Sequence, residues 1–194
     1  MLPLALFPLN SVLFPDGRLR LKVFEARYID MVSHCLKNDQ PFGICLIDEG
    51  NETGSAAVPC RVGTLAHIVD WEMAQQGVFT LTVSGGRRFD VVDYEVNSNQ
   101  AVLARVRLRE EMPREKLAPE FELSKRVLGQ LLIKEGDPYY LEHQRSNDAD
   151  WVANRLAELL PMDNLDRQAL LEQDDPELRL QVIQDALTEH GWHQ

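Results

Sequence analysis

The chain has 194 residues, of which 44% are hydrophobic and 26% are charged. This is the balance of an ordinary globular protein, so it excludes a disordered chain, and the length suits one sizeable core or two small units that share one. The formal net charge of −11 repels phosphate groups, which argues against non-specific binding of nucleic acid.

The cysteines and the start of the chain bear on its compartment. Cys35, Cys45 and Cys60 are odd in number and have no CxxC spacing, so we expect neither a disulfide framework nor a zinc site, and a reducing cytoplasm fits best. The apolar start, MLPLALFPLNSVLF, has no basic residue and is interrupted by Pro3 and Pro8, which argues against a signal peptide. No stretch approaches the roughly 18 to 20 apolar residues that span a bilayer. We therefore expect a cytoplasmic protein that makes no contact with a membrane.

The first half of the chain reads mainly as strands joined by short turns. Apolar and polar residues alternate in several segments, as in strands with one buried face. One segment, residues 24–37, changes to spacings of three and four and predicts an amphipathic helix that ends at Asn38 and Asp39. We expect strands at 2–7, where Pro8 stops the run, and at 19–23, 42–48, 62–72, 78–84, 87–96 and 101–109, with Gly85 and Gly86 breaking the run between two of them.

The second half reads as helices. Proline at the start of a helix and glycine past its end mark the first of them, and side chains that cap a helix N-terminus mark later ones. Helices are expected at 119–136, at 148–161, at 165–173 with Asn164 as the cap, and from Pro176 onward with Asp175 as the cap.

The order of these elements predicts an α+β protein. Residues 1–112 are expected to form a closed or nearly closed antiparallel β barrel with one packed helix, because several strands follow one another with short turns. Residues 113–194 are expected to form a separate, C-terminal helical bundle.

An ordered set of motifs resembles the N-terminal domain family of Lon proteases. The opening LFPLNSVLFPDGRLRLKVFEARYIDMV, residues 6–32, is similar to the family's LFPL, VLFPG and IFEPRY segments, and the likeness continues at VGTLAHIV, GGRRFDV and LAELLPMDNLDRQALLEQDDPELRL. Asp16 and Ala26 stand where the family has glycine and proline, which affects local turn geometry more than the fold. The resemblance implies a PUA-like β pseudobarrel followed by a helical bundle.

The same resemblance implies a role in binding other proteins. Lon N-terminal domains help to recognise substrate polypeptides, so we expect a non-catalytic module that binds unfolded or partly folded polypeptides, as an adaptor or beside a Lon-type protease. The chain has no Gly-Lys pair and so no phosphate-binding loop of an ATPase, and no cofactor is expected. We expect a groove between the barrel and the bundle, with an exposed strand edge adding backbone hydrogen bonds. The candidate contacts are large apolar groups of the β-rich half: Phe14, Phe24, Trp71 and Phe79.

A cluster of Glu25, Arg27 and Tyr28 lies where a strand gives way to the helix. An acid in the first turn suits the helix dipole, so we interpret the cluster as a structural joint and not as a catalytic site. We further expect Glu25 or Arg27 to pair with a charge from GGRRFD, which would fix the helix to the barrel.

Two alternative functions compete with polypeptide binding. A PUA-like module could bind a small molecule or RNA through a basic patch. The alternative is that the arginines of this patch form ion pairs with Asp90, Asp93 or Glu95, and the absence of interleaved aromatic residues and the net charge favour this alternative. A hydrolase would need Cys45 or Cys60 beside His34 or His67, and no local motif supports it. His190 and His193 have a helix-compatible spacing, but a terminal tail is the better interpretation, so no metal site is expected. The arginines of the basic patch are Arg87, Arg88, Arg105, Arg107 and Arg109.

Overall fold

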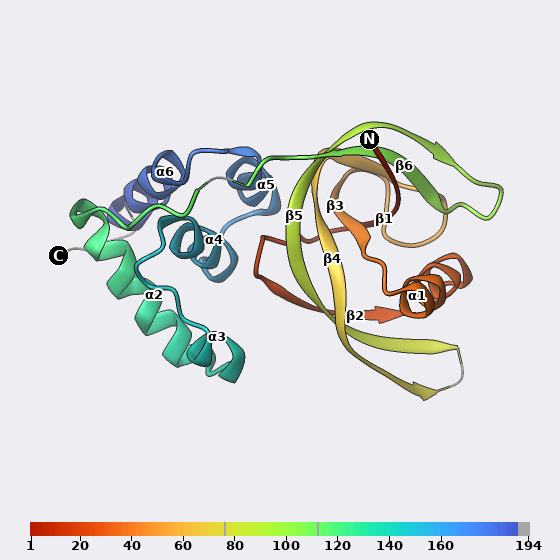
Figure 1. Cartoon of the computed structure of the whole chain (residues 1–194), viewed down its shortest axis with the longest axis horizontal. Coiled ribbons are helices and arrows are strands. Elements are labelled where there is room, and N and C mark those ends of the chain that lie inside the picture. The colour runs from red at the N-terminus through yellow and green to blue at the C-terminus, as the bar shows by residue number, and fades with distance from the viewer. Residues whose placement is uncertain (76, 112, 190–194) are drawn as a thin grey trace. The chain divides into compact units, whose positions relative to one another are not determined.

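The structure is a computed structural model that describes residues 1–75, 77–111 and 113–189. The chain divides into two compact units, Met1–Glu111 and Met112–Gln194 (Figure 1).

The first unit is a six-stranded sheet that closes on itself. The strands follow the order β2-β5-β4-β3-β1-β6, and β5 also pairs with β6, so five strands form a ring and β2 extends from β5 (Figure 1). All pairs are antiparallel except β1 and β3, which are parallel because β2 and α1 lie between them in the chain. The elements are β1 (Leu2–Leu9), β2 (Arg18–Val23), α1 (Ala26–Asn38), β3 (Phe42–Glu49), β4 (Val58–Gln75), β5 (Val78–Val96) and β6 (Val102–Leu108).

Strand β1 does not stop at Pro8, as the sequence predicts, but continues to Leu9. Proline has no N–H to donate, yet Pro8 pairs with Cys45 in the parallel ladder. It is tolerated because β6 pairs only with residues 2–6, so this end of β1 has a strand neighbour on one side only.

Strand β5 is also longer than predicted, since Gly85 and Gly86 do not break it. Between Thr64 and Ala66 the register with β4 shifts, and two residues of β5 lie opposite one residue of β4. Such a bulge bends a strand and lets it change neighbours. The first half of β5 pairs with β2 and the second half with β6, which gives the unit its closure.

Helix α1 follows the predicted pattern. It buries Tyr28, Val32 and Cys35, and it ends where Asp39 adopts the left-handed conformation at φ 51°. The buried face packs on a cluster that includes Phe42, Phe79 and Leu81.

The second unit holds the predicted helices and one that the sequence patterns did not indicate, α3. Asp175 caps the last helix as expected, because its Oδ1 accepts from the N–H groups of Glu177 (2.9 Å) and Leu178 (3.2 Å). The predicted cap Asn164 is wrong by one residue: the Asp163 side chain accepts from Asp166 N–H. The elements are η1 (Pro119–Phe121), α2 (Glu122–Glu135), α3 (Pro138–Glu142), α4 (Ala149–Leu159), α5 (Asn164–Glu172) and α6 (Pro176–Glu189).

A buried arginine joins three helices of this unit. The Arg179 guanidinium, on α6, donates to Asp150 and Asn154 on α4 at 2.7 Å, and to the Leu170 carbonyl on α5 at 2.9 Å. Since a buried cation is stable only when its donors are satisfied, this network specifies how α4, α5 and α6 pack.

Candidate functional site

A groove of about 370 Å³ lies in the first unit, along β2. Strands β1 and β2, the start of α1 and the loop after β3 contribute its walls. Most of the lining is apolar, and the charged groups come from β2, the start of α1 and the loop. The lining residues are Phe7, Leu9, Ser11, Leu19, Arg20, Leu21, Lys22, Val23, Phe24, Glu25, Tyr28, Glu52 and Thr53.

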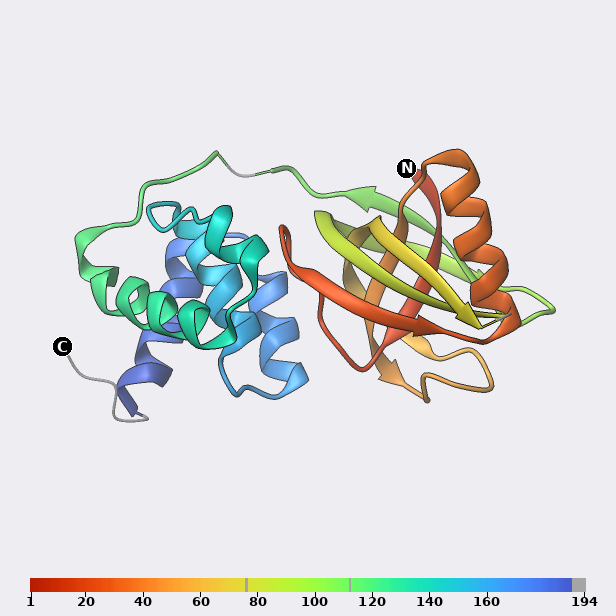
Figure 2. The same ribbon diagram turned by 90° about the horizontal axis from the view of Figure 1, so that it is seen from below.

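The groove follows the free edge of β2. Successive side chains of a strand point to opposite faces, so a hollow lined by all six residues 19–24 must run beside the strand and not over one face. In the part of the chain that the structure describes, β5 is the only strand that pairs with β2. Figure 2 shows β2 crossing the ring with α1 following it.

The pairing with β5 decides which backbone groups point to this edge. Gly17 C=O accepts from Gly85 N–H at 2.8 Å, and the ladder continues without a shift from Arg18 to Val23. Bonding residues alternate along an antiparallel strand, so the N–H and C=O groups of Arg20 and Lys22 point away from β5. These are the groups that an added strand could bond.

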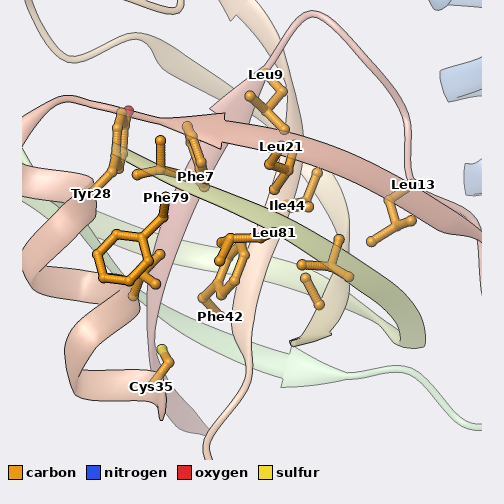
Figure 3. Packing of buried hydrophobic residues seen from close by; sticks show 14 residues of the cluster. Phe7, Leu9, Leu13, Leu21, Tyr28, Cys35, Phe42, Ile44, Phe79 and Leu81 are labelled. Atoms are coloured by element: carbon orange, nitrogen blue, oxygen red, sulfur yellow. The ribbon is translucent and has the colours of Figure 1, made fainter. Parts of the chain in front are cut away.

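The floor of the groove belongs to the core of the unit. The rings of Phe7 and Tyr28 stack with their centroids 4.0 Å apart, and Leu9 lies near Leu21 (Figure 3). Because this floor is buried and well packed, the groove has a fixed shape before any partner arrives.

A polar network supports the part of the groove that is lined by Glu25, Tyr28 and Glu52. The Arg27 Nη1 donates to the Gln100 carbonyl at 2.8 Å, and Nη2 lies 3.1 Å from a Glu25 carboxylate oxygen. The guanidinium also lies over the Tyr28 ring, 4.5 Å from its centroid. Glu52 Oε1 accepts from Asn10 N–H, which holds the loop after β3 against the end of β1.

The predicted partner of this joint is wrong. Glu25 and Arg27 bond to each other and to the segments around residues 52–54 and 100, and not to GGRRFD. Arg87 instead pairs with Glu111 at 3.6 Å. Arg27 has this partner because the turn between β5 and β6, which contains Gln100, lies beside the start of α1.

Two of the predicted contact residues are in the core. Phe14 is fully buried and Phe79 is 4% exposed, and neither lines the groove, so the prediction for them is wrong. Large apolar side chains lie in the core more often than on the surface, and Phe14 and Phe79 follow this tendency. Phe24 and Trp71 are 54% and 51% exposed. Phe24 lines the groove, whereas Trp71 is not among the lining residues and packs against Phe79 with ring centroids 5.9 Å apart.

The cysteine alternative gains no support from Cys45. Its thiol lies in the core between β strands, and burial raises its pKa far above the ordinary range, with nearby Cys60 adding to the effect. A thiol in such surroundings stays protonated and is not a nucleophile. His190 and His193 lie outside the described residues, and within the described ranges there is no group of three or more His, Cys, Asp or Glu residues that could hold a metal ion.

The basic patch is paired across strands. Arg105 binds Asp93, with Nε 2.8 Å from Oδ1, and this bond lowers the pKa of the aspartate. Arg107 and Arg109 both reach Asp90, at 3.4 and 2.9 Å. Each of these three arginines therefore has an acidic partner across the strands, as the ion-pair alternative predicts, with Arg107 and Arg109 sharing one carboxylate.

The groove itself was missed by reasoning from sequence. The segment LRLKV carries a signal, because its cations alternate with apolar residues as on an edge strand. The signal cannot tell which strand is the neighbour, since that depends on pairing with residues some sixty positions later.

The fold and the groove thus define a ring-shaped β unit with an open strand edge, followed by a helical unit. The family model for the substrate-binding domain of ATP-dependent protease La (LON) matches residues 3–189. The chain belongs to this Lon substrate-binding domain family.

Solved structures agree with the family. A Lon N-terminal domain protein from Xanthomonas campestris is 37% identical with a TM-score of 0.81, covering 95% of this chain and 98% of that one. The N-terminal domain of the Mycobacterium avium complex Lon protease is 18% identical with a TM-score of 0.69, covering 97% and 99%, and supports the fold alone. These matches confirm the predicted fold class. A search of curated proteins found no match.

Among the described helices, none is both long enough and apolar enough to cross a membrane.

Proposed function

We propose that the protein is a non-catalytic cytoplasmic module that binds extended segments of unfolded or partly folded polypeptides. It would serve as a recognition or adaptor component, with a Lon-type protease as one partner. Membership of the substrate-binding domain family supports this role.

The observation that carries the proposal is the groove along the edge of β2 that pairs with no other strand in the described residues. A bound segment would add as a further strand, bonding the free backbone groups of Arg20 and Lys22. Its apolar side chains would lie on the floor beside Leu21 and Tyr28. Backbone bonding accepts many sequences, which suits a receptor for unfolded chains.

Peptide binding tests the proposal. A fluorescent apolar peptide of about eight residues, long enough to span β2, should bind with an affinity measurable by fluorescence anisotropy. Methylating alternate backbone nitrogens of the peptide should abolish binding, because it removes the donors of an added strand.

Phe24→Ala should weaken peptide binding by about fivefold to thirtyfold, since it removes an exposed aromatic group from the groove. Trp71→Ala is the matched control, as Trp71 is equally exposed but does not line the groove. Equal losses in both variants, or none in either, would count against this groove as the binding site.

A further inference from the structure

The charges beside the groove suggest which polypeptide segments it prefers. Arg20 and Lys22 are exposed on β2, and neither has a hydrogen-bond or ion-pair partner among the described residues. Of the two acids at the groove, Glu25 pairs with Arg27, whereas Glu52 accepts from Asn10 N–H and keeps its charge, so the two unpaired cations outnumber the one unpaired acid.

The cross-strand neighbours explain why the two cations are unpaired. Lys22 lies opposite Thr80, and Arg20 lies opposite Thr82, so each faces a neutral hydroxyl side chain. On β4, the strand beyond β5, Asp70 lies opposite Thr82 and Glu72 lies opposite Thr80. The backbones of β4 and β2 are two strand spacings apart, about 10 Å. In the described part of the chain, neither acid forms an ion pair with Arg20 or Lys22.

A strand added at the free edge would place its own side chains beside Arg20 and Lys22. Residues two apart in the added strand share a face, so acidic residues at alternate positions would pair with the two cations. The residues between them would point to the opposite face, beside Leu19, Leu21 and Val23 and toward the apolar floor.

We propose that the groove selects extended segments in which acidic residues alternate with apolar ones. This inference rests on the proposed function and adds a substrate class to it. The same cations disfavour self-association through this edge, because a second copy pairing through β2 would bring like charges together.

Four peptides of about eight residues test the inference by fluorescence anisotropy. The first three alternate valine with glutamate, glutamine or lysine. The fourth has the glutamate and valine residues of the first peptide in two blocks. We expect affinity to fall from glutamate to glutamine to lysine, by about twofold to fivefold per charge pair. The block peptide should bind more weakly than the alternating one, because it cannot place acids on one face and apolar groups on the other.

The double substitution Arg20→Gln and Lys22→Gln should remove the preference for glutamate over glutamine and lysine. The matched control, Lys37→Gln with Arg61→Gln, removes two exposed cations outside the groove and should leave the preference intact. Raising the salt from about 50 mM to about 500 mM should shrink the preference in the unmodified protein.

The outcomes separate the two proposals. Equal binding of the glutamate and glutamine peptides would overturn the charge preference and leave polypeptide binding standing. Equal binding of the alternating and block peptides would overturn the alternation. If none of the four peptides binds, and the apolar peptide also fails, the proposed function itself is wrong.

Discussion

At the scale of single residues, Arg27 has the largest structural consequence in the groove. Its side chain is 3% exposed and connects three segments that are distant in sequence: the start of α1, the loop at Glu52 and the turn at Gln100. A buried cation with these partners holds the three segments in one arrangement beside the groove.

Arg27→Met should lower the free energy of unfolding by about 2–4 kcal/mol, because it leaves the Gln100 carbonyl without its side-chain donor and the Glu25 carboxylate without its cation. Urea denaturation followed by circular dichroism measures the change. Arg105→Met is the control, and it should change stability far less, because the Arg105–Asp93 pair is solvent-exposed and screened. A similar loss in both variants would show that Arg27 has no special structural role.

At the scale of elements, the bulge in β5 makes the groove possible. It bends the strand so that one half supports β2 and the other half closes the ring with β6. Because β2 pairs with residues 79–84 of β5 and β6 with residues 89–96, a straight β5 would hold the two strands end to end along one edge, and β2 would not turn away from the ring.

Gly85 allows the chain before β2 to lie close against β5. A Cβ atom at Gly85 would lie 2.0 Å from the Phe14 carbonyl oxygen, and that backbone cannot move aside without breaking the bonds between residues 16–17 and β5. Gly85→Ala should therefore destabilise the protein by about 3 kcal/mol or more, measured by urea unfolding.

Gly129→Ala is the matched control for this prediction. Gly129 lies inside α2, and nothing within 4 Å would meet an added Cβ, so alanine should stabilise that helix by about 0.5–1 kcal/mol. The prediction for Gly85 fails if its alanine variant is as stable as the unmodified protein.

At the scale of the whole molecule, the proposed binding site belongs to one of the two units. Every residue that lines the groove lies between Phe7 and Tyr28 or at Glu52 and Thr53, within Met1–Glu111. This unit also has its own hydrophobic clusters, one against α1 and another within the ring.

Residues 1–111 expressed alone should fold and bind the apolar peptide within about twofold of the affinity of the full chain, because a unit with its own core can fold independently. Thermal unfolding by circular dichroism and peptide anisotropy check the two parts. Residues 113–194 alone serve as the control and should not bind. Cooperative folding without binding would mean that the helical unit supplies contacts that the groove lacks.

The sequence by itself determined much of the local structure. Alternation of apolar and polar residues indicated the strands, the spacing of Tyr28, Val32 and Cys35 indicated α1, and Asp175 indicated the last helix. These features depend on residues within a few positions of one another, which is why pattern reasoning finds them. The ordered motifs likewise indicated the Lon family, which the family model confirms.

Only the tertiary structure decided which of these residues form the surface of the groove. Phe14 and Phe24 follow similar local patterns, yet one is core and the other is exposed, because burial depends on strand pairing across the sheet. One of the partners of Arg27, the Gln100 carbonyl, is 73 positions away. The free edge of β2 exists because distant strands pair elsewhere, and such long-range pairing is not encoded in any short stretch of residues.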